Sequence, residues 1–210
     1  PRQRPPRTPM QGRYCRLEPL SAARHAADLF DAFSQAPDAS DWTYMSVGPF
    51  ADAQAYLRFA EAAQASDDPL HHAVIELATG CAIGSLALMR VDTASGVMEV
   101  GFVCYSRQLK RTRAATEAQF LLMQRAFDEL GYRRYEWKCD SLNAPSRAAA
   151  ARLGFRFEGV FRQAVVYKGR SRDTAWFSII DSEWPALRAA YQRWLEPGTF
   201  DAQGGQLRSL

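Results

Sequence analysis

The segment from Val97 to Ala118 brings residues that can do chemistry to the junction of a predicted strand and a predicted helix. Gly101 interrupts the strand, and a glycine there often marks a bulge or a close backbone approach to a ligand. Four basic residues follow, Arg107, Lys110, Arg111 and Arg113. A helix start has unpaired N–H groups and a partial positive charge, so it favours an anion. The sequence therefore predicts a diphosphate cradle at this junction, with a solvated basic loop as the alternative.

A second motif opens an Ala-rich helix that Gly154 ends. Asn143 stands where a helix N-cap is expected, and its amide is also a candidate partner for a ligand. Ser146 lies one helical turn before Ala150, so both residues share a helix face. Its hydroxyl is either an ordinary first-turn serine or a group that reaches a reacting sulfur.

Together these motifs resemble those of the GNAT N-acetyltransferases. Lys110-Arg111-Thr112-Arg113-Ala114-Ala115 is similar to the pyrophosphate-binding motif Gln/Arg-x-x-Gly-x-Gly/Ala, with Arg113 and Ala115 in place of the glycines. Asn143-Ala144-Pro145-Ser146 and Arg152-Leu153-Gly154-Phe155 are similar to the N-x-x-S…L-G-F pattern, with Ala150 at the position of a frequent tyrosine acid. The resemblance runs from about Arg13 to Glu196, and its branch is the one that contains the RimJ/RimL ribosomal-protein N-terminal acetyltransferases.

The resemblance implies a three-layer α/β/α fold with a splayed central mixed sheet. It implies acetyl-CoA as co-substrate and no metal. The strand at Phe102, Val103 and Cys104 would pair with the pantetheine arm, and Asn143 would contact that arm. The expected diphosphate-binding residues are Lys110, Arg111, Thr112, Arg113, Ala114 and Ala115.

The activity implied is that of an acyltransferase that moves an acetyl group to a primary amine by direct attack in a ternary complex. The amine belongs to a protein N-terminus or to a small molecule, and the alternative is a catalytically weak CoA-binding sensor or structural module. Glu99 is the candidate base, because a carboxylate near the opening can take the amine proton; an exposed strand carboxylate is the alternative. Ser146 is the second catalytic candidate. Acceptor-side candidates are Trp42, Tyr44, Phe161, Arg162 and Trp176, although such aromatics are more often core.

The elements that position these residues are expected in the order β-α-α-β-β-β-α-β-α-β-β, followed by a C-terminal helix. Antiparallel strands followed by a β-α-β crossover indicate an α/β architecture with a mixed sheet and helices on both faces. The expected strands are 14–20, 71–77, 82–90, 97–105, 135–139, 155–167 and 173–180, and the expected helices are 22–34, 50–64, 112–129, 143–153 and 182–195.

Length and composition limit the classes of protein to which the chain can belong. With 210 residues and 47% hydrophobic content, we expect a single acetyltransferase domain at 13–196, a flexible arm at 1–12 and a flexible tail at 197–210. A net charge of +3 gives no case for nucleic acid, and no apolar run reaches the about 18 residues of a membrane span. We therefore expect a cytoplasmic monomer or homodimer.

Cysteine and histidine placement also argues against a metal site. The four cysteines are far apart, which predicts buried free thiols rather than disulfides or zinc ligands. The histidines His25, His71 and His72 lack metal-binding spacing and are expected at the surface or a strand edge.

Overall fold

The computed structural model describes residues 1–201 and 205–210. The strands are β1 (Met10–Gln11), β2 (Cys15–Pro19), β3 (Leu70–Glu76), β4 (Ala82–Asp92), β5 (Val97–Tyr105), β6 (Arg134–Asp140), β7 (Arg156–Tyr167) and β8 (Arg170–Ile180). They form one sheet in the order β1-β2-β3-β4-β5-β6-β8-β7, in which only β5 and β6 are parallel. The predicted mixed sheet is confirmed.

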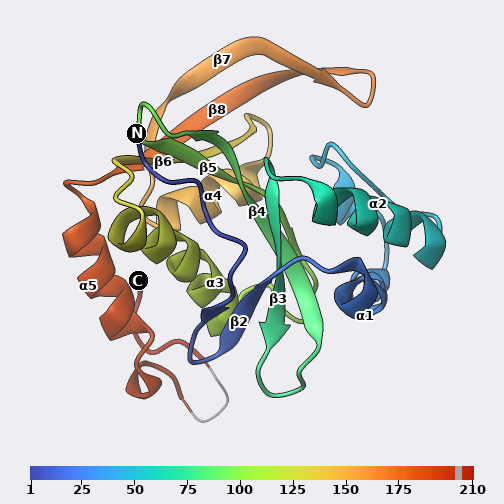
Figure 1. The fold of residues 1–210 in the computed structure, drawn as a ribbon, viewed down its shortest axis with the longest axis horizontal. Coiled ribbons are helices and arrows are strands. Elements are labelled where there is room, and N and C mark those ends of the chain that lie inside the picture. The colour runs from blue at the N-terminus through green and yellow to red at the C-terminus, as the bar shows by residue number, and fades with distance from the viewer. Residues whose placement is uncertain (202–204) are drawn as a thin grey trace.

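Helices cover both faces of this sheet. They are α1 (Ala22–Ser34), α2 (Ala53–Ala65), α3 (Arg113–Gln124), α4 (Ala144–Arg152) and α5 (Trp184–Trp194), with short turns η1 (Ser40–Trp42), η2 (Arg125–Glu129) and η3 (Pro197–Thr199). Figure 1 shows α3 and α5 on one side of the sheet and α1 and α2 on the other. The predicted α/β/α layering is confirmed, and so is the predicted order of elements except for β1, an additional strand in the segment expected to be a flexible arm. The predicted helix at 112–129 differs only at its end, where η2 continues α3 as a π-helix.

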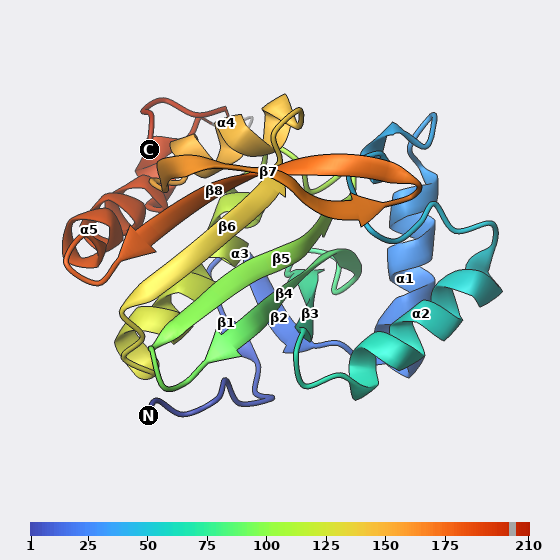
Figure 2. The same cartoon turned by 90° about the horizontal axis from the view of Figure 1, so that it is seen from above.

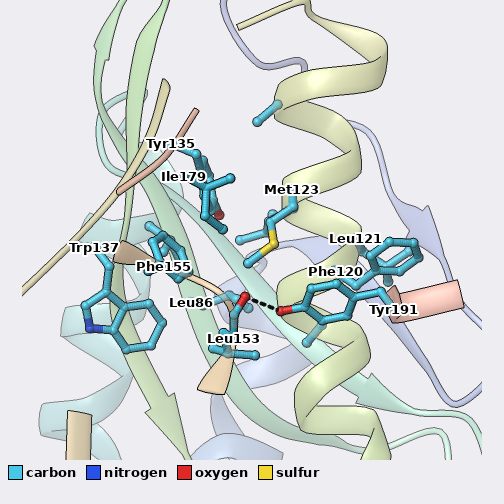
Figure 3. Close-up of a cluster of buried hydrophobic side chains, with 14 of the residues drawn as sticks. Leu86, Phe120, Leu121, Met123, Tyr135, Trp137, Leu153, Phe155, Ile179 and Tyr191 are labelled. Atoms are coloured by element: carbon cyan, nitrogen blue, oxygen red, sulfur yellow. Dashed lines mark hydrogen bonds between the residues drawn. The ribbon is translucent and has the colours of Figure 1, made fainter. Parts of the chain in front are cut away.

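The larger core lies between the sheet and the helices α3, α4 and α5 (Figure 3). Strand β6 supplies Tyr135 and Trp137 to it, because alternate side chains of a strand point to the same face. The ring of Phe120 stacks on that of Tyr191 at a centroid distance of 5.2 Å. The Tyr191 hydroxyl also donates a hydrogen bond of 2.9 Å to the Leu153 carbonyl, which ties α5 to the end of α4.

A buried carboxylate fixes α3 against the edge of the sheet. Glu117 accepts hydrogen bonds of 2.7, 2.7 and 2.8 Å from the backbone N–H groups of Arg13, Tyr14 and Cys15. A Cβ at Gly12 would collide with this carboxylate, so the turn before β2 needs a glycine for close approach. Because Glu117 lies in the second turn of α3, the same contacts position the N-terminus of that helix.

The predicted bulge in β5 is present, one residue beyond Gly101. Ser85 pairs with Cys104 and Ala87 pairs with Gly101, so β5 carries one extra residue. Phe102 has a φ of 49°, in the left-handed region that a bulge can require. Gly101 serves another purpose, since a Cβ there would collide with Met89 Sδ.

Several polar residues lie deeper than the sequence predicts. His25, His71 and His72 are all buried, which corrects the expectation of surface or strand-edge histidines. The reason for the last two is that β3 lies between β2 and β4 in the interior of the sheet. All four cysteines are free, as predicted, but Cys81 is exposed.

The two terminal segments lie against the folded body. Met10 and Gln11 pair with β2, the Tyr132 hydroxyl donates to the Gln3 carbonyl, and the buried Arg125 guanidinium donates to the carbonyls of Pro6 and Pro9. In the tail, Phe200 is buried. Residues 202–204 of the expected tail lie outside the described residues. The flexibility of both segments stays a prediction.

Deleting residues 1–9 tests the contribution of the arm. Arg125 would lose both carbonyl partners and keep only its ion pair with Glu129, and the loss of hydrogen bonds from a buried charged donor costs about 2 kcal/mol. At this chain length we expect Tm in calorimetry to fall by about 4–8 °C. Arg4→Ala, which removes only a surface ion pair, is the control and should change Tm by less than about 2 °C. An unchanged Tm after the deletion would show that the arm is detached in solution.

Candidate functional site

The parallel strands β5 and β6 separate part-way along their length. They pair only from Val97 with Arg134 to Val100 with Trp137. Beyond this point Phe102 and Val103 have no register partner in either β4 or β6. Unpaired backbone groups on a strand can bind an extended ligand by main-chain hydrogen bonds. The structure therefore provides an opening where the sequence predicts the pantetheine arm.

The loop before α3 presents free backbone donors. The N–H groups of Arg111, Arg113 and Ala114 have no hydrogen-bond partner in the part of the chain that the structure describes. Thr112 is the N-cap, and its hydroxyl accepts from the Ala115 N–H at 3.1 Å and donates to the Leu109 carbonyl at 2.7 Å. Three free N–H groups at a helix N-terminus form an anion-binding arrangement, which suits a diphosphate.

The backbone of this loop does not need the glycines that the motif usually has. The positive φ, 63°, falls at Arg111, whereas Arg113 and Ala115 are helical residues of α3. The Arg113 guanidinium lies 4.5 Å from the Tyr14 ring centroid and 5.2 Å from that of Phe200. Arg113 is therefore predicted to contribute its N–H group, and its cation packs between aromatic rings instead.

A small pocket of about 50 Å³ lies at the end of β5. It brings the cofactor candidates Val103, Cys104 and Lys110 next to the acceptor candidate Trp42. The Lys110 ammonium forms an ion pair with Asp41 of η1, so the basic loop is joined to the segment that follows α1. Burial raises the pKa of the Cys104 thiol to about 12, so this cysteine stays neutral near pH 7.

Glu99 is buried, which replaces the alternative of an exposed strand carboxylate. Its Oε2 atom lies 2.9 Å from Lys138 Nζ and 3.4 Å from Arg90 Nε. Burial raises the pKa of Glu99 above the ordinary glutamate value, and the Lys138 ammonium and the Arg90 guanidinium oppose this effect. Since its strand neighbours Met98 and Val100 enter the larger core, Glu99 faces the other side of the sheet, where α1 and α2 lie.

Ser146 lies on the opposite face of the sheet, where β5 and β6 stop pairing. Its hydroxyl accepts a hydrogen bond of 3.0 Å from Trp137 Nε1, and its N–H donates to the Asn143 side chain at 3.1 Å. Asn143 is therefore the N-cap of α4, as predicted, and its role toward pantetheine stays a prediction. Ala150 is fully buried in the core. The Ser146 proton remains available for a second partner because Ser146 is the acceptor in the indole contact.

The acceptor candidates lie in different environments. Trp42 is half-buried and contacts the rings of Phe33 and Phe50, and it lies outside both hydrophobic cores. The Trp176 ring packs against that of Phe161 at a centroid distance of 4.5 Å, with a tilt of 30°. The Lys138 ammonium lies 3.8 Å from the Trp176 ring centroid, which places this ring beside Glu99.

Tyr44 and Lys168 make further hydrogen bonds on the acceptor side of the sheet. The Tyr44 hydroxyl donates to the Leu142 carbonyl, and Lys168 at the tip of the β7–β8 hairpin donates to the carbonyls of Trp42 and Val47. Figure 2 shows this hairpin reaching from the sheet toward α1. Arg162 is an exposed residue of β7.

Sequence reasoning missed the partners of both catalytic candidates: Lys138 and Arg90 at Glu99, and Trp137 at Ser146. The sequence of β6 contains a signal for the partners of Glu99. Polar residues alternate with apolar ones along this strand, namely Arg134, Glu136, Lys138 and Asp140. This period of two indicates a strand with one polar and one apolar face. It does not reveal that the polar face is buried, because that depends on elements distant in sequence.

Comparison with known proteins agrees with this geometry. The family model "Acetyltransferase (GNAT) domain" matches residues 15–156. A GCN5-related N-acetyltransferase structure from Brucella melitensis is 52% identical, with a TM-score of 0.97, covering 100% of this chain and 95% of that chain. A probable GNAT-family acetyltransferase structure from Chromobacterium violaceum is 44% identical, with a TM-score of 0.82, covering 88% of this chain and 91% of that one.

A curated relative is similar over a shorter stretch. The "Putative ribosomal N-acetyltransferase YdaF" of Bacillus subtilis is 28% identical over 105 residues, which is 50% of this chain and 57% of that protein. Because the family model covers more than half of the sequence, the chain belongs to the GNAT acetyltransferases, in their RimJ/RimL-type family. It is an N-acetyltransferase that uses acetyl-CoA.

The residues present fit acetyl-CoA. The free N–H groups before α3 suit its diphosphate, and the unpaired stretch at Phe102 suits an extended pantetheine. Within residues 1–201 and 205–210, no group of three or more His, Cys, Asp or Glu is arranged to hold a metal ion, and no helix is long and apolar enough to cross a membrane. That the enzyme needs no metal stays a prediction.

Reversing the charge at Arg111 tests the cradle. Arg111→Glu places a carboxylate beside the diphosphate, so we expect KM for acetyl-CoA to rise about tenfold or more, with a smaller change in kcat, because the diphosphate does not react. Arg58→Glu, on the exposed side of α2, is the control for the change in net charge. Steady-state kinetics with varied acetyl-CoA make the measurement. An equal loss in kcat and unchanged KM would assign Arg111 to another step.

Proposed function

We propose that this enzyme transfers the acetyl group directly to a primary amine in a ternary complex, with Glu99 as the base. The observation that carries the proposal is the position of Glu99 and Ser146 on opposite faces of the sheet, beside the opening between β5 and β6. An amine can approach from the Glu99 side while the sulfur leaves toward Ser146. Both reactants are then held at one opening, which favours direct attack.

The amine nitrogen forms a bond to the acetyl carbon, the carbon–sulfur bond breaks, and the released thiolate takes a proton from water, directly or through Ser146, which regains its own proton from water. Glu99 takes the proton that the nitrogen loses and returns it to water after product release. The backbone N–H groups at the Phe102 bulge would donate to the thioester oxygen as charge develops on it, and such donors stabilise transition states strongly.

Charge on the Glu99 side favours an acceptor with a single amine. Glu99 and Glu136 are carboxylates of this face beside the opening, and both are paired with Lys138 Nζ, whereas Asp140, further along β6, accepts a hydrogen bond from the Tyr167 hydroxyl. Arg90 and Arg134 add further positive charge to the same two carboxylates. A polyamine or an aminoglycoside would need unpaired carboxylates for its additional cations. We therefore favour a protein or peptide N-terminus, which is consistent with the name of the Bacillus subtilis relative.

Substitution of Glu99 tests the base. Glu99→Gln keeps the shape and removes the basicity, so kcat should fall about 10²-fold while acetyl-CoA affinity is almost unchanged. In the wild type the rate falls as pH drops and Glu99 becomes protonated, and burial puts that midpoint above the ordinary glutamate range. The variant should lose the fall in rate that comes from protonation of Glu99. Its rate should recover at high pH, where the acceptor amine is already neutral. Equal kcat for both proteins at every pH would remove Glu99 from the mechanism.

A thiol-release assay tests the acceptor. Acetyl-CoA is offered with peptides that have free N-termini, with the same peptides blocked at the N-terminus, and with polyamines and aminoglycosides. We expect release with the free peptides and at least about tenfold less with the polycations. Preferential use of a polycation would overturn the assignment of the acceptor. Release with none of these amines would favour a CoA-binding module with weak turnover.

A further inference from the structure

Lys138 occupies an unusual position for a cation, because it is buried on the face of the sheet where the acceptor is expected. Its Nζ atom lies 2.9 Å from Glu99 Oε2, 2.7 Å from Glu136 Oε2 and 3.8 Å from the centroid of the Trp176 ring. Only 8% of its side chain is exposed. The ammonium thus has two carboxylates and an indole face as its surroundings, an arrangement that stabilises a buried cation.

The two oxygens of Glu99 have different partners. Oε2 forms ion pairs with both cations, Lys138 and Arg90. Oε1 makes no hydrogen bond with any residue in the ranges 1–201 and 205–210, whereas Oε2 accepts one from Lys138 Nζ. It lies toward Gly101, since a Cβ built on that residue would be 3.9 Å from Oε1. The free oxygen therefore points to the start of the bulge, where β5 leaves its partner strand.

We propose that Lys138 is a positioning residue that holds Glu99 through Oε2 and keeps this buried carboxylate ionised, while Oε1 stays open to the acceptor amine. The inference rests on the proposed role of Glu99 as the base. Without a cation at Oε2, a buried glutamate beside a second carboxylate would take up a proton and could no longer accept one from the amine. Lys138 thus allows a base to be both buried and ionised.

The other groups that face Glu99 do not substitute for Lys138. Arg90 of β4 is 63% exposed, so its interaction with Glu99 is screened by solvent. Glu136 of β6 is a carboxylate and opposes ionisation. Arg134 and Glu158 pair with each other further along the sheet. His71 of β3 is on the same face, but burial lowers its pKa to about 4, so it is neutral near pH 7.

The protonation of Glu99 can be followed without any acceptor. The probe is the protein labelled with ¹³Cδ-glutamate and titrated by NMR, with the spectrum of Glu99→Gln to assign the signal. Because Lys138→Met alone would leave two buried carboxylates with only Arg90 and Arg134 as cationic partners, which destabilises the fold, the main variant is Lys138→Met combined with Glu136→Gln. The reference is Glu136→Gln alone, since loss of that carboxylate by itself lowers the Glu99 midpoint. We expect the midpoint in the double variant to lie about one pH unit or more above that of the reference, since an opposite charge within about 4–6 Å shifts a pKa by about 1–3 units.

Two further variants serve as controls. Lys138→Arg keeps the positive charge and should leave the midpoint within about half a unit of the wild type. Arg134→Met removes a cation from the same strand and face without touching Glu99, and should also leave the midpoint nearly unchanged. A midpoint in the double variant equal to that of Glu136→Gln alone, with both proteins folded by circular dichroism, would overturn the proposal.

Kinetics separate this inference from the proposed function. With acetyl-CoA and a peptide amine, the acid limb of kcat/KM should lie at higher pH in the double variant than in Glu136→Gln alone, as the NMR midpoint does. In a Glu99→Gln background, removing Lys138 should cause no further pH shift, because the two changes act through one group. If Glu99→Gln leaves kinetics unchanged, the base assignment fails whatever the titration gives. If Glu99→Gln impairs turnover but the double variant has the same acid limb as Glu136→Gln alone, only the role of Lys138 fails.

Discussion

The loss of pairing between β5 and β6 after Val100 and Trp137 is the constraint on which the site depends. Backbone N–H and C=O groups that leave a sheet must find other partners, or their burial costs free energy. The two strands stay anchored around this stretch, because β5 pairs with β4 before and after its bulge and β6 keeps its ladder with β8. The unpaired groups are thus confined to one opening, and an extended ligand is the natural partner for them.

The two faces of the sheet at this opening differ in chemistry. On one face, Tyr135 and Trp137 enter an apolar core against α3, α4 and α5. On the other, three carboxylates and three cations form a chain of ion pairs across neighbouring strands, namely Glu99, Glu136, Glu158, Arg90, Lys138 and Arg134. Buried ion pairs are weak evidence for stability, because desolvation offsets their attraction. Their placement next to the opening agrees better with a functional reason for keeping charge there.

Periodicity and turn residues in the sequence were sufficient to predict the order of elements, the mixed sheet and the N-cap at Asn143. Local signals of this kind determine which segments form helices and strands. The contacts of Lys138 could not be predicted in this way, because they join β5, β6 and β8 across the sheet. The Arg113 side chain illustrates the same limit. Its basic character suggested a phosphate contact, but Tyr14 and Phe200, distant in sequence, provide the surface on which it packs.

The single extra residue in β5 explains both the opening and the direction of the side chains around it. Before the bulge, Met98 and Val100 enter the larger core, so Glu99 faces the α1 and α2 side. In a regular strand Phe102 would then follow Val100 into the core. Its positive φ instead places the ring against His71, 4.9 Å away, while Val103 and Tyr105 pack on the core. One bulge therefore leaves two residues without register partners and keeps the strand anchored on both sides of them, which is what a rigid opening in a sheet requires.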